Sequence, residues 1–223
     1  MSEIKTILLN RSVADSIEEE AEELRRELKE KKTFLLNVMS SPGSGKTTTL
    51  IQIVNRLKSK FKIAIMEADI DSDVDAIRVS KETGVKSIQL HTGGMCHLDG
   101  AMTRQGLDEL DEHYDFVILE NIGNLVCPAE FDTGASLNMV ILSVPEGTDK
   151  PLKYPLMFEK SDLVLINKID TIDYFDFNFS VVNDFIYKRN KNATIFKISA
   201  KNGTGIDAVC KHLTTLIENW EGK

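Results

Sequence analysis

Residues 34–47 of the chain read FLLNVMSSPGSGKT. Phe34–Met39 is a short apolar run of the kind that forms a buried strand, and a helical pattern begins at residue 47. The intervening residues match the phosphate-binding pattern GxxxxGK[ST], except that Ser40 replaces the first glycine. Gly43 and Gly45 allow the backbone to wrap with its N–H groups inward, which makes an anion nest at a helix N-terminus. The stretch therefore predicts a phosphate-binding loop.

The polar residues of this loop predict specific contacts with a nucleoside triphosphate and its metal ion. Lys46 is expected to reach the β- and γ-phosphates, and the Thr47 hydroxyl is expected to bind Mg²⁺. The expected phosphate-binding residues are Gly43, Ser44, Gly45, Lys46, Thr47 and Thr48. No arginine finger is evident in the sequence, so we expect slow intrinsic turnover.

The rest of the chain continues the alternation of strand and helix. Expected strands are Phe34–Met39, Lys62–Glu67, Ser87–Leu90, Phe116–Glu120, Met139–Val144, Leu163–Asn167 and Ala193–Ile198. Expected helices are Thr47–Lys58, His97–Leu110, Ser180–Arg189 and Gly205–Trp220. This order predicts an α/β fold: a doubly wound, mainly parallel sheet with helices on both faces, as in P-loop NTPases. Ligands are then expected at the carboxyl ends of the strands.

The first 32 residues have a different character. Val13, Ile17, Ala21, Leu24 and Leu28 recur at spacings of three and four among charged residues, which predicts one amphipathic helix over residues 12–32. We therefore divide the chain into an N-terminal charged helix, residues 1–32, and a P-loop nucleotide-binding domain, residues 33–223. The helix is expected to close the edge of the core or to pair with a partner.

Composition excludes several classes of function. The chain has 223 residues, a net charge of −8 and three cysteines. An acidic chain is a poor ligand for nucleic acid, whose phosphates require clustered Lys and Arg. The apolar runs are too short to span a membrane, and the first 20 residues lack the pattern of a secretory signal. We expect a cytoplasmic protein with reduced thiols and with neither a membrane nor a nucleic-acid partner.

A second motif predicts which base is bound. Asn167-Lys168-Ile169-Asp170 follows the expected strand Leu163–Asn167. The Asp170 carboxylate can accept hydrogen bonds from N1–H and the N2 amine of guanine, whereas adenine would leave a desolvated carboxylate unpaired. Lys168 is expected along the base, and Asn167 is expected to link this loop to the phosphate loop. Ser199, Ala200 and Lys201 follow the last expected strand, where a backbone N–H can donate to guanine O6.

Acidic residues after two other strands are candidates for the metal ion and the attacking water. Glu120-Asn-Ile-Gly123 stands where GTPases usually place DxxG, whose Gly N–H contacts the γ-phosphate. Asp69 and Asp75 follow the strand that ends near residue 67 and are expected to help hold Mg²⁺ or orient water. The acidic residues between them, Asp71 and Asp73, are interpreted as parts of a solvated loop.

Cys96, His97 and Cys127 are candidates for a second metal site. Cys96 and His97 lie in the loop before one expected helix, and Cys127 lies four residues after Gly123. Thiolate and imidazole ligands suit Ni²⁺ or Zn²⁺. Three ligands indicate an open site or a site shared across a two-fold axis. The spacing alone is equally compatible with buried free cysteines and a hydrogen-bonded histidine. Cys210 fits the core.

Several strings resemble one known family. SSPGSGKTTTL, TGGMCHLD, ENIGNLVCPAEFDTG, EGTDKPLKYP and NKID are similar to those of HypB-type hydrogenase-maturation GTPases. The resemblance runs from about Thr33 to the C-terminus. It implies a P-loop domain of the SIMIBI class, a homodimer favoured by GTP, and metal ligands at Cys96, His97 and Cys127. It also implies hydrogenase maturation factors and the hydrogenase large subunit as partners.

The resemblance has a limit at the N-terminus. Some family members carry an N-terminal Cys-rich nickel motif and others carry a His-rich tract, whereas residues 1–32 contain no Cys and no His. High-affinity N-terminal nickel binding is therefore not expected of these residues.

The expected function is that of a GTP-hydrolysing metallochaperone that couples nucleotide state and dimerisation to nickel delivery during [NiFe]-hydrogenase maturation. One alternative is a urease-type nickel GTPase, whose Cys-Pro-His motif is absent here, since the chain reads Cys-Pro-Ala at residues 127–129. The other alternative is a non-catalytic metal-binding scaffold with a vestigial nucleotide site. Intact Lys46, Thr47 and Asp170 favour the GTPase.

Overall fold

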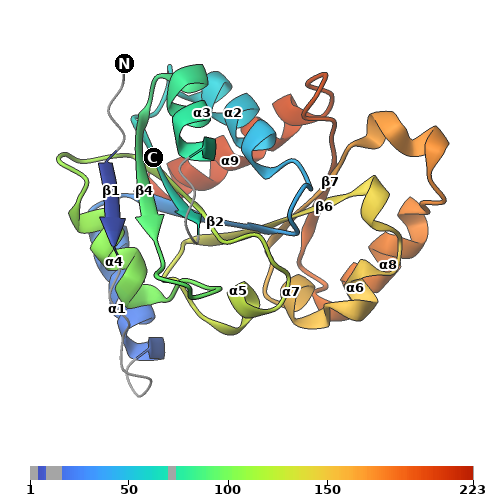
Figure 1. Cartoon of the computed structure of the whole chain (residues 1–223), viewed down its shortest axis with the longest axis horizontal. Helices are drawn as coiled ribbons and strands as arrows, with labels where there is room; N and C mark the ends of the chain where they lie inside the picture. Colours follow the sequence, from blue (N-terminus) through green and yellow to red (C-terminus); the bar gives the residue numbers. More distant parts are fainter. Residues whose placement is uncertain (1–4, 9–16, 70–73, 223) are drawn as a thin grey trace.

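A computed structural model describes residues 5–8, 17–69 and 74–222 (Figure 1). Its strands are β1 (Lys5–Leu8), β2 (Phe34–Ser40), β3 (Ile63–Asp69), β4 (Lys86–His91), β5 (Phe116–Glu120), β6 (Leu137–Ser143), β7 (Leu163–Asn167) and β8 (Thr194–Lys197). Its longer helices are α1 (Ile17–Glu30), α2 (Lys46–Leu57), α3 (Val74–Thr83), α4 (Gly100–Asp108), α8 (Phe179–Arg189) and α9 (Ile206–Glu221). Short helical turns are α5 (Cys127–Glu130), η2 (Val144–Glu146), α6 (Lys150–Lys153), α7 (Pro155–Glu159) and η3 (Ile169–Tyr174). Among these elements no helix is long and apolar enough to cross a membrane.

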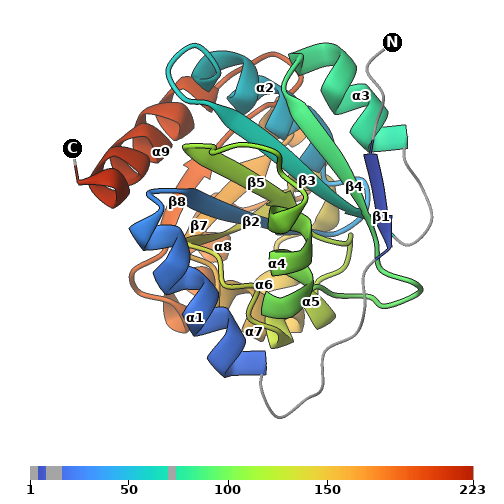
Figure 2. The ribbon, with the colours of Figure 1, turned by 90° about the vertical axis from the view of Figure 1, so that its left-hand side faces the viewer.

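The strands form one eight-stranded parallel sheet in the order β1-β4-β3-β5-β2-β6-β7-β8. Helices α2, α3 and α9 cover one face, and α1, α4 and α5–α8 cover the other (Figure 2). The predicted doubly wound fold is confirmed. Because β2 lies between β5 and β6, the loops after all three strands meet at one edge of the sheet.

The alternation of side chains along β2 builds the core on both faces of the sheet. Leu36 and Val38 pack with residues of α2 and α9, including Leu50 and Leu213. Leu35, which precedes Leu36 and points to the opposite face, packs in a second cluster under α1 and α4. A third cluster lies on the same side under α7 and α8. Burial on both faces explains why the strands read as continuous apolar runs.

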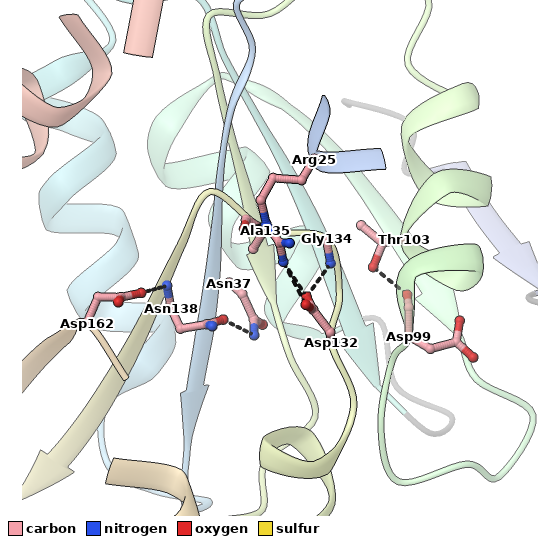
Figure 3. A network of polar contacts seen from close by, with 9 residues as sticks. All are labelled: Arg25, Asn37, Asp99, Thr103, Asp132, Gly134, Ala135, Asn138 and Asp162. Atoms are coloured by element: carbon pink, nitrogen blue, oxygen red, sulfur yellow. Dashed lines mark hydrogen bonds and ion pairs between the residues drawn. The ribbon is translucent and has the colours of Figure 1, made fainter. Parts of the chain in front are cut away.

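Helix α1 packs closely on the rest of the chain. Its Ala21 faces Gly100 and Gly134, where a Cβ would come within 2.9 Å and 3.0 Å of the α1 backbone. Arg25 donates to both oxygens of Asp132 at 2.7 Å and to the Ala135 carbonyl at 2.9 Å, as Figure 3 shows. Within the described residues the helix begins at Ile17, so the first part of the expected helix lies outside them. The division of the chain at residue 32 remains a prediction.

Three local elements differ from the sequence-based expectation. Neither strand β1 nor helix α3 was predicted. The helix expected from residue 97 begins instead at Gly100, because the Asp99 carboxylate accepts a hydrogen bond from the Met102 N–H at 2.8 Å and caps the helix.

Candidate functional site: a nucleotide pocket beside a thiol pair

The phosphate loop connects β2 to α2 and has the backbone of an anion nest. Gly43 and Gly45 have φ angles of +75° and +95°, a conformation that favours glycine. At Gly45 a Cβ would lie 2.5 Å from the amide nitrogen of Asn167, so the close approach of these two loops also requires glycine. The loop N–H groups and the N-terminus of α2 together favour an anion.

A cavity of about 600 Å³ opens over this loop. Its lining includes many of the residues that the sequence assigned to the nucleotide: Gly43, Gly45, Lys46, Thr47, Thr48, Asp69, Asp75, Glu120, Gly123 and Lys168. Both candidate acids, Asp69 at the end of β3 and Asp75 in α3, thus line the same cavity as the phosphate loop. Asp71 and Asp73 lie outside the described residues.

Two buried carboxylates stand at the floor of the cavity. Glu120 on β5 lies 3.6 Å from Lys46 Nζ and accepts a hydrogen bond from the Thr47 hydroxyl at 3.4 Å. Glu67 on β3 is its register partner in the sheet. Burial raises the pKa of Glu120 to about 7, although Lys46 opposes the shift. Burial, followed by repulsion from Glu120, raises the pKa of Glu67 to about 9.

These residues fit a magnesium ion. Within the described part of the chain, one oxygen of Glu67 and one of Glu120 are buried without a hydrogen-bond partner. The Thr47 hydroxyl lies beside them. Hard oxygen ligands of this kind suit Mg²⁺, and a divalent cation would also relieve the repulsion between the carboxylates.

The expected guanine-reading loop is joined to the phosphate loop by direct contacts. The Asn167 side chain donates to the Ser44 carbonyl at 2.9 Å and accepts from the Ala200 N–H at 3.0 Å. Lys168 donates to the Gly43 carbonyl at 2.5 Å. The three loops that would surround a nucleotide are therefore held in one arrangement.

Ser199 and Ala200, which were expected near the base, make hydrogen bonds within the protein. The Ser199 hydroxyl donates to Asp170 at 2.5 Å and orients its exposed carboxylate. The Ala200 N–H donates to the Asn167 side chain, and the Ser199 N–H donates to the Thr204 carbonyl at 2.9 Å. Of the three residues expected to contact guanine O6, Lys201 is therefore the remaining candidate donor.

The segment after β5 connects the nucleotide cavity to two thiols. A Cβ on Gly123 would lie 3.6 Å from Lys46 Nζ, which places this glycine against the phosphate loop. Four residues later Cys127 begins α5, and its sulfur lies 2.8 Å from that of Cys96. Both cysteines are free thiols. The hydrogen bond with Cys96 raises the pKa of Cys127, and burial raises it further.

The third candidate ligand does not join the thiols. The His97 ring stacks on Phe131, with 3.6 Å between centroids and 8° between the planes. Across the described residues, no three or more Asp, Glu, Cys or His side chains form a cluster that could hold a metal. Cys210 is buried in the core, as expected, and burial raises its pKa to about 11.

Two charged cavity residues were missed in the sequence. Glu67 and Arg78 both line the cavity, and Arg78 pairs with Glu82 one turn along α3 at 2.8 Å. A lone carboxylate in the apolar stretch Ile63–Ala68 was an available signal for Glu67. No signal in the sequence pointed to Arg78, because helix α3, which carries it, was not expected.

Comparison with known proteins agrees with this architecture. Residues 34–197 match the family model "CobW/HypB/UreG, nucleotide-binding domain". Hydrogenase maturation factor HypB of Rhizobium leguminosarum bv. viciae is 40% identical over 211 residues, which cover 93% of this chain and 70% of that protein. A hydrogenase/urease maturation factor HypB of Helicobacter hepaticus is 39% identical over 210 residues, which cover 92% and 86%.

A solved structure gives the same result in three dimensions. The crystal structure of HypB from Helicobacter pylori in complex with nickel superposes with a TM-score of 0.85 at 39% identity, covering 92% of this chain and 97% of that one. The chain therefore belongs to the CobW/HypB/UreG family of nucleotide-binding domains and, within it, to the HypB proteins.

Proposed function

We propose that the chain is a Mg²⁺-dependent GTPase that couples nucleotide state and dimerisation to nickel delivery during [NiFe]-hydrogenase maturation. One observation carries the proposal: Gly123, packed against Lys46, lies four residues from Cys127 in a single segment, and Cys127 meets Cys96. A γ-phosphate contact at one end of this segment therefore acts on a metal-binding thiol at the other. The crystal structure of HypB from Helicobacter pylori in complex with nickel supports nickel as the cargo.

Guanine is the proposed base because Asp170 supplies a carboxylate acceptor in the expected base loop. Its carboxylate, held by Ser199, can accept hydrogen bonds from the two donors on the guanine edge. Adenine presents an acceptor at N1 and has no amine at position two, so its binding would leave the carboxylate desolvated and unpaired. The exposed Lys201 is the proposed source of the O6 hydrogen bond.

Hydrolysis is proposed to follow from charge stabilisation at the phosphate loop. Lys46 and the loop N–H groups would stabilise negative charge on the transferring phosphoryl group, while Thr47 and Glu120 would hold Mg²⁺. The metal ion supplies further neutralisation of phosphate charge when bound. Asp69 and Asp75, at the cavity wall, are the proposed groups that orient the attacking water.

Nickel, or zinc in its place, is proposed to bind Cys96, Cys127 and His97. The two thiols already lie together, whereas His97 stacks on Phe131 and would have to rotate to join them. Three ligands leave the coordination incomplete, so a second copy of the chain is the proposed source of the rest. Hydrogenase maturation factors and the hydrogenase large subunit remain the proposed partners for delivery.

One experiment separates this function from its alternatives. Phosphate release from GTP and from ATP is measured with Mg²⁺, together with nickel binding, in the wild type and in Cys127→Ala. The proposal expects slow release from GTP, far less from ATP, and nickel binding that requires Cys127. A nickel-binding chain without hydrolysis would support the non-catalytic scaffold. The chain is also expressed in cells that lack their own nickel-insertion GTPases for hydrogenase and for urease. Restoration of urease activity but not of hydrogenase activity there would favour the urease-type alternative.

A further inference from the structure

The side chain of Asn124 bridges the two loops that carry the thiols. Its amide nitrogen donates to the Cys96 carbonyl at 2.7 Å. Its amide oxygen accepts from the Cys127 N–H at 2.9 Å and from the Val126 N–H at 3.0 Å. One side chain thus holds the backbone of both cysteines, directly beside the 2.8 Å contact between their sulfurs.

We infer that Asn124 is the positioning residue that keeps Cys96 and Cys127 together as a metal-binding pair and transmits movement of Gly123 to that pair. Asn124 follows Gly123 directly, so a shift of the glycine toward or away from a γ-phosphate must move the amide group. The amide would carry that movement to the backbone of both thiols. The nucleotide and nickel part of this inference rests on the proposed function, whereas the pairing of the thiols does not.

The surroundings of the two loops restrict the movement to this region. Beyond α5, Asp132 is held by two hydrogen bonds from Arg25 and accepts another from the Gly134 N–H at 2.8 Å (Figure 3). Beyond Cys96, Leu98 is fully buried and Asp99 caps α4. Both loops are therefore anchored a few residues past their cysteines, and Asn124 bridges them on the side of the nucleotide.

The chemistry of the bridge requires an amide. An amide donates through nitrogen and accepts through oxygen at the same time, which matches a carbonyl on one loop and two N–H groups on the other. Aspartate at position 124 keeps the acceptor but places a carboxylate against the Cys96 carbonyl. Alanine removes both interactions. The two substitutions therefore test the donor arm and the whole bridge separately.

The first measurement is independent of nickel. Phenylarsine oxide exchanges its oxygen for two neighbouring thiol sulfurs and releases water, so it reports whether the thiols are paired. Cys210 is a residue of α9, where it is buried against α2 in the core, and it cannot serve as the second thiol. Titrations compare the wild type, Asn124→Ala, Asn124→Asp, and the control Asn178→Ala, which removes an asparagine cap from α8 instead. We expect both Asn124 variants to bind the arsenical about 10-fold more weakly, since partners outside the ligand shell contribute 10–100-fold to metal affinity.

The second measurement is a nickel titration of the same four proteins, each saturated with GDP or with a non-hydrolysable GTP analogue. We expect the ratio of the two nickel affinities to approach one in both Asn124 variants, and to match the wild type in Asn178→Ala. If both Asn124 variants bind the arsenical as the wild type does, Asn124 does not hold the two thiols together. If both keep the wild-type ratio of nickel affinities, Asn124 does not transmit the nucleotide state to the thiols. A wild type that binds the arsenical but no nickel would refute the proposed nickel function and leave the pairing role of Asn124 intact.

Discussion

Replacement of Asn167 by alanine tests whether the base loop and the phosphate loop form one unit. The substitution removes a donor to the Ser44 carbonyl at 2.9 Å and an acceptor for the Ala200 N–H at 3.0 Å. Ser44, Asn167 and Ala200 are all buried, so both backbone groups lose their partners away from water. An unsatisfied buried group costs about 1–3 kcal/mol, so the loss of both partners is expected to lower stability by about 2–6 kcal/mol.

The assay is urea unfolding of the nucleotide-free chain, with Asn55→Ala as the control. Asn55 is exposed and makes one bond of 3.3 Å to the Glu82 carbonyl, so its removal is expected to cost less than about 1 kcal/mol. Binding of GDP to Asn167→Ala is measured in parallel and is expected to weaken by about 10-fold or more, since about 1.4 kcal/mol of lost loop order corresponds to a factor of ten. Equal stability of the two variants, together with wild-type GDP binding, would refute the view that Asn167 joins the loops.

Three further predictions concern the proposed nucleotide site. Lys46→Ala should abolish GTP hydrolysis and weaken nucleotide binding, and retained wild-type phosphate release would remove the phosphate-loop assignment. Asp170→Asn should lose its preference for GTP and gain relative affinity for xanthosine nucleotides in competition binding; a wild type that takes ATP as readily as GTP would contradict the guanine assignment. Burial and Glu120 raise the pKa of Glu67 to about 9, so the folded chain holds a proton that the unfolded chain has lost. In EDTA and without nucleotide, stability should therefore fall as pH rises from about 5 to 9, and denaturation of Glu67→Gln should show a smaller slope.

The motifs could be predicted because their chemistry is local. Gly43 and Gly45 have the positive φ angles that a phosphate nest requires, and Asn167 and Glu120 end strands of a parallel sheet. Once the βα alternation is recognised, the carboxyl ends of such strands must meet at one edge. The link from Asn167 to the phosphate loop followed from this reasoning, and a contact of 2.9 Å between its amide and Ser44 makes that link.

The features that were not predicted depend on tertiary packing, which a single sequence does not display. Helix α3 buries mainly small or polar residues, among them Ala76, Ser80 and Thr83, so its periodicity is weak and Arg78 was overlooked. The stacking of His97 on Phe131 joins residues 34 positions apart in irregular loops. The role of the Ala200 N–H could not be anticipated either, because it depends on where the side-chain oxygen of Asn167 lies in three dimensions.

Nickel affinity in the two nucleotide states is the measurement that tests the coupling most directly. The wild type and Cys127→Ala are titrated with nickel while saturated with GDP or a non-hydrolysable GTP analogue, and the oligomeric state is measured in parallel. We predict tighter nickel binding and more dimer in the analogue state of the wild type, and weak, nucleotide-independent binding in Cys127→Ala. Equal nickel affinity in the two states, with Cys127→Ala indistinguishable from the wild type, would contradict the coupling even if the chain hydrolyses GTP.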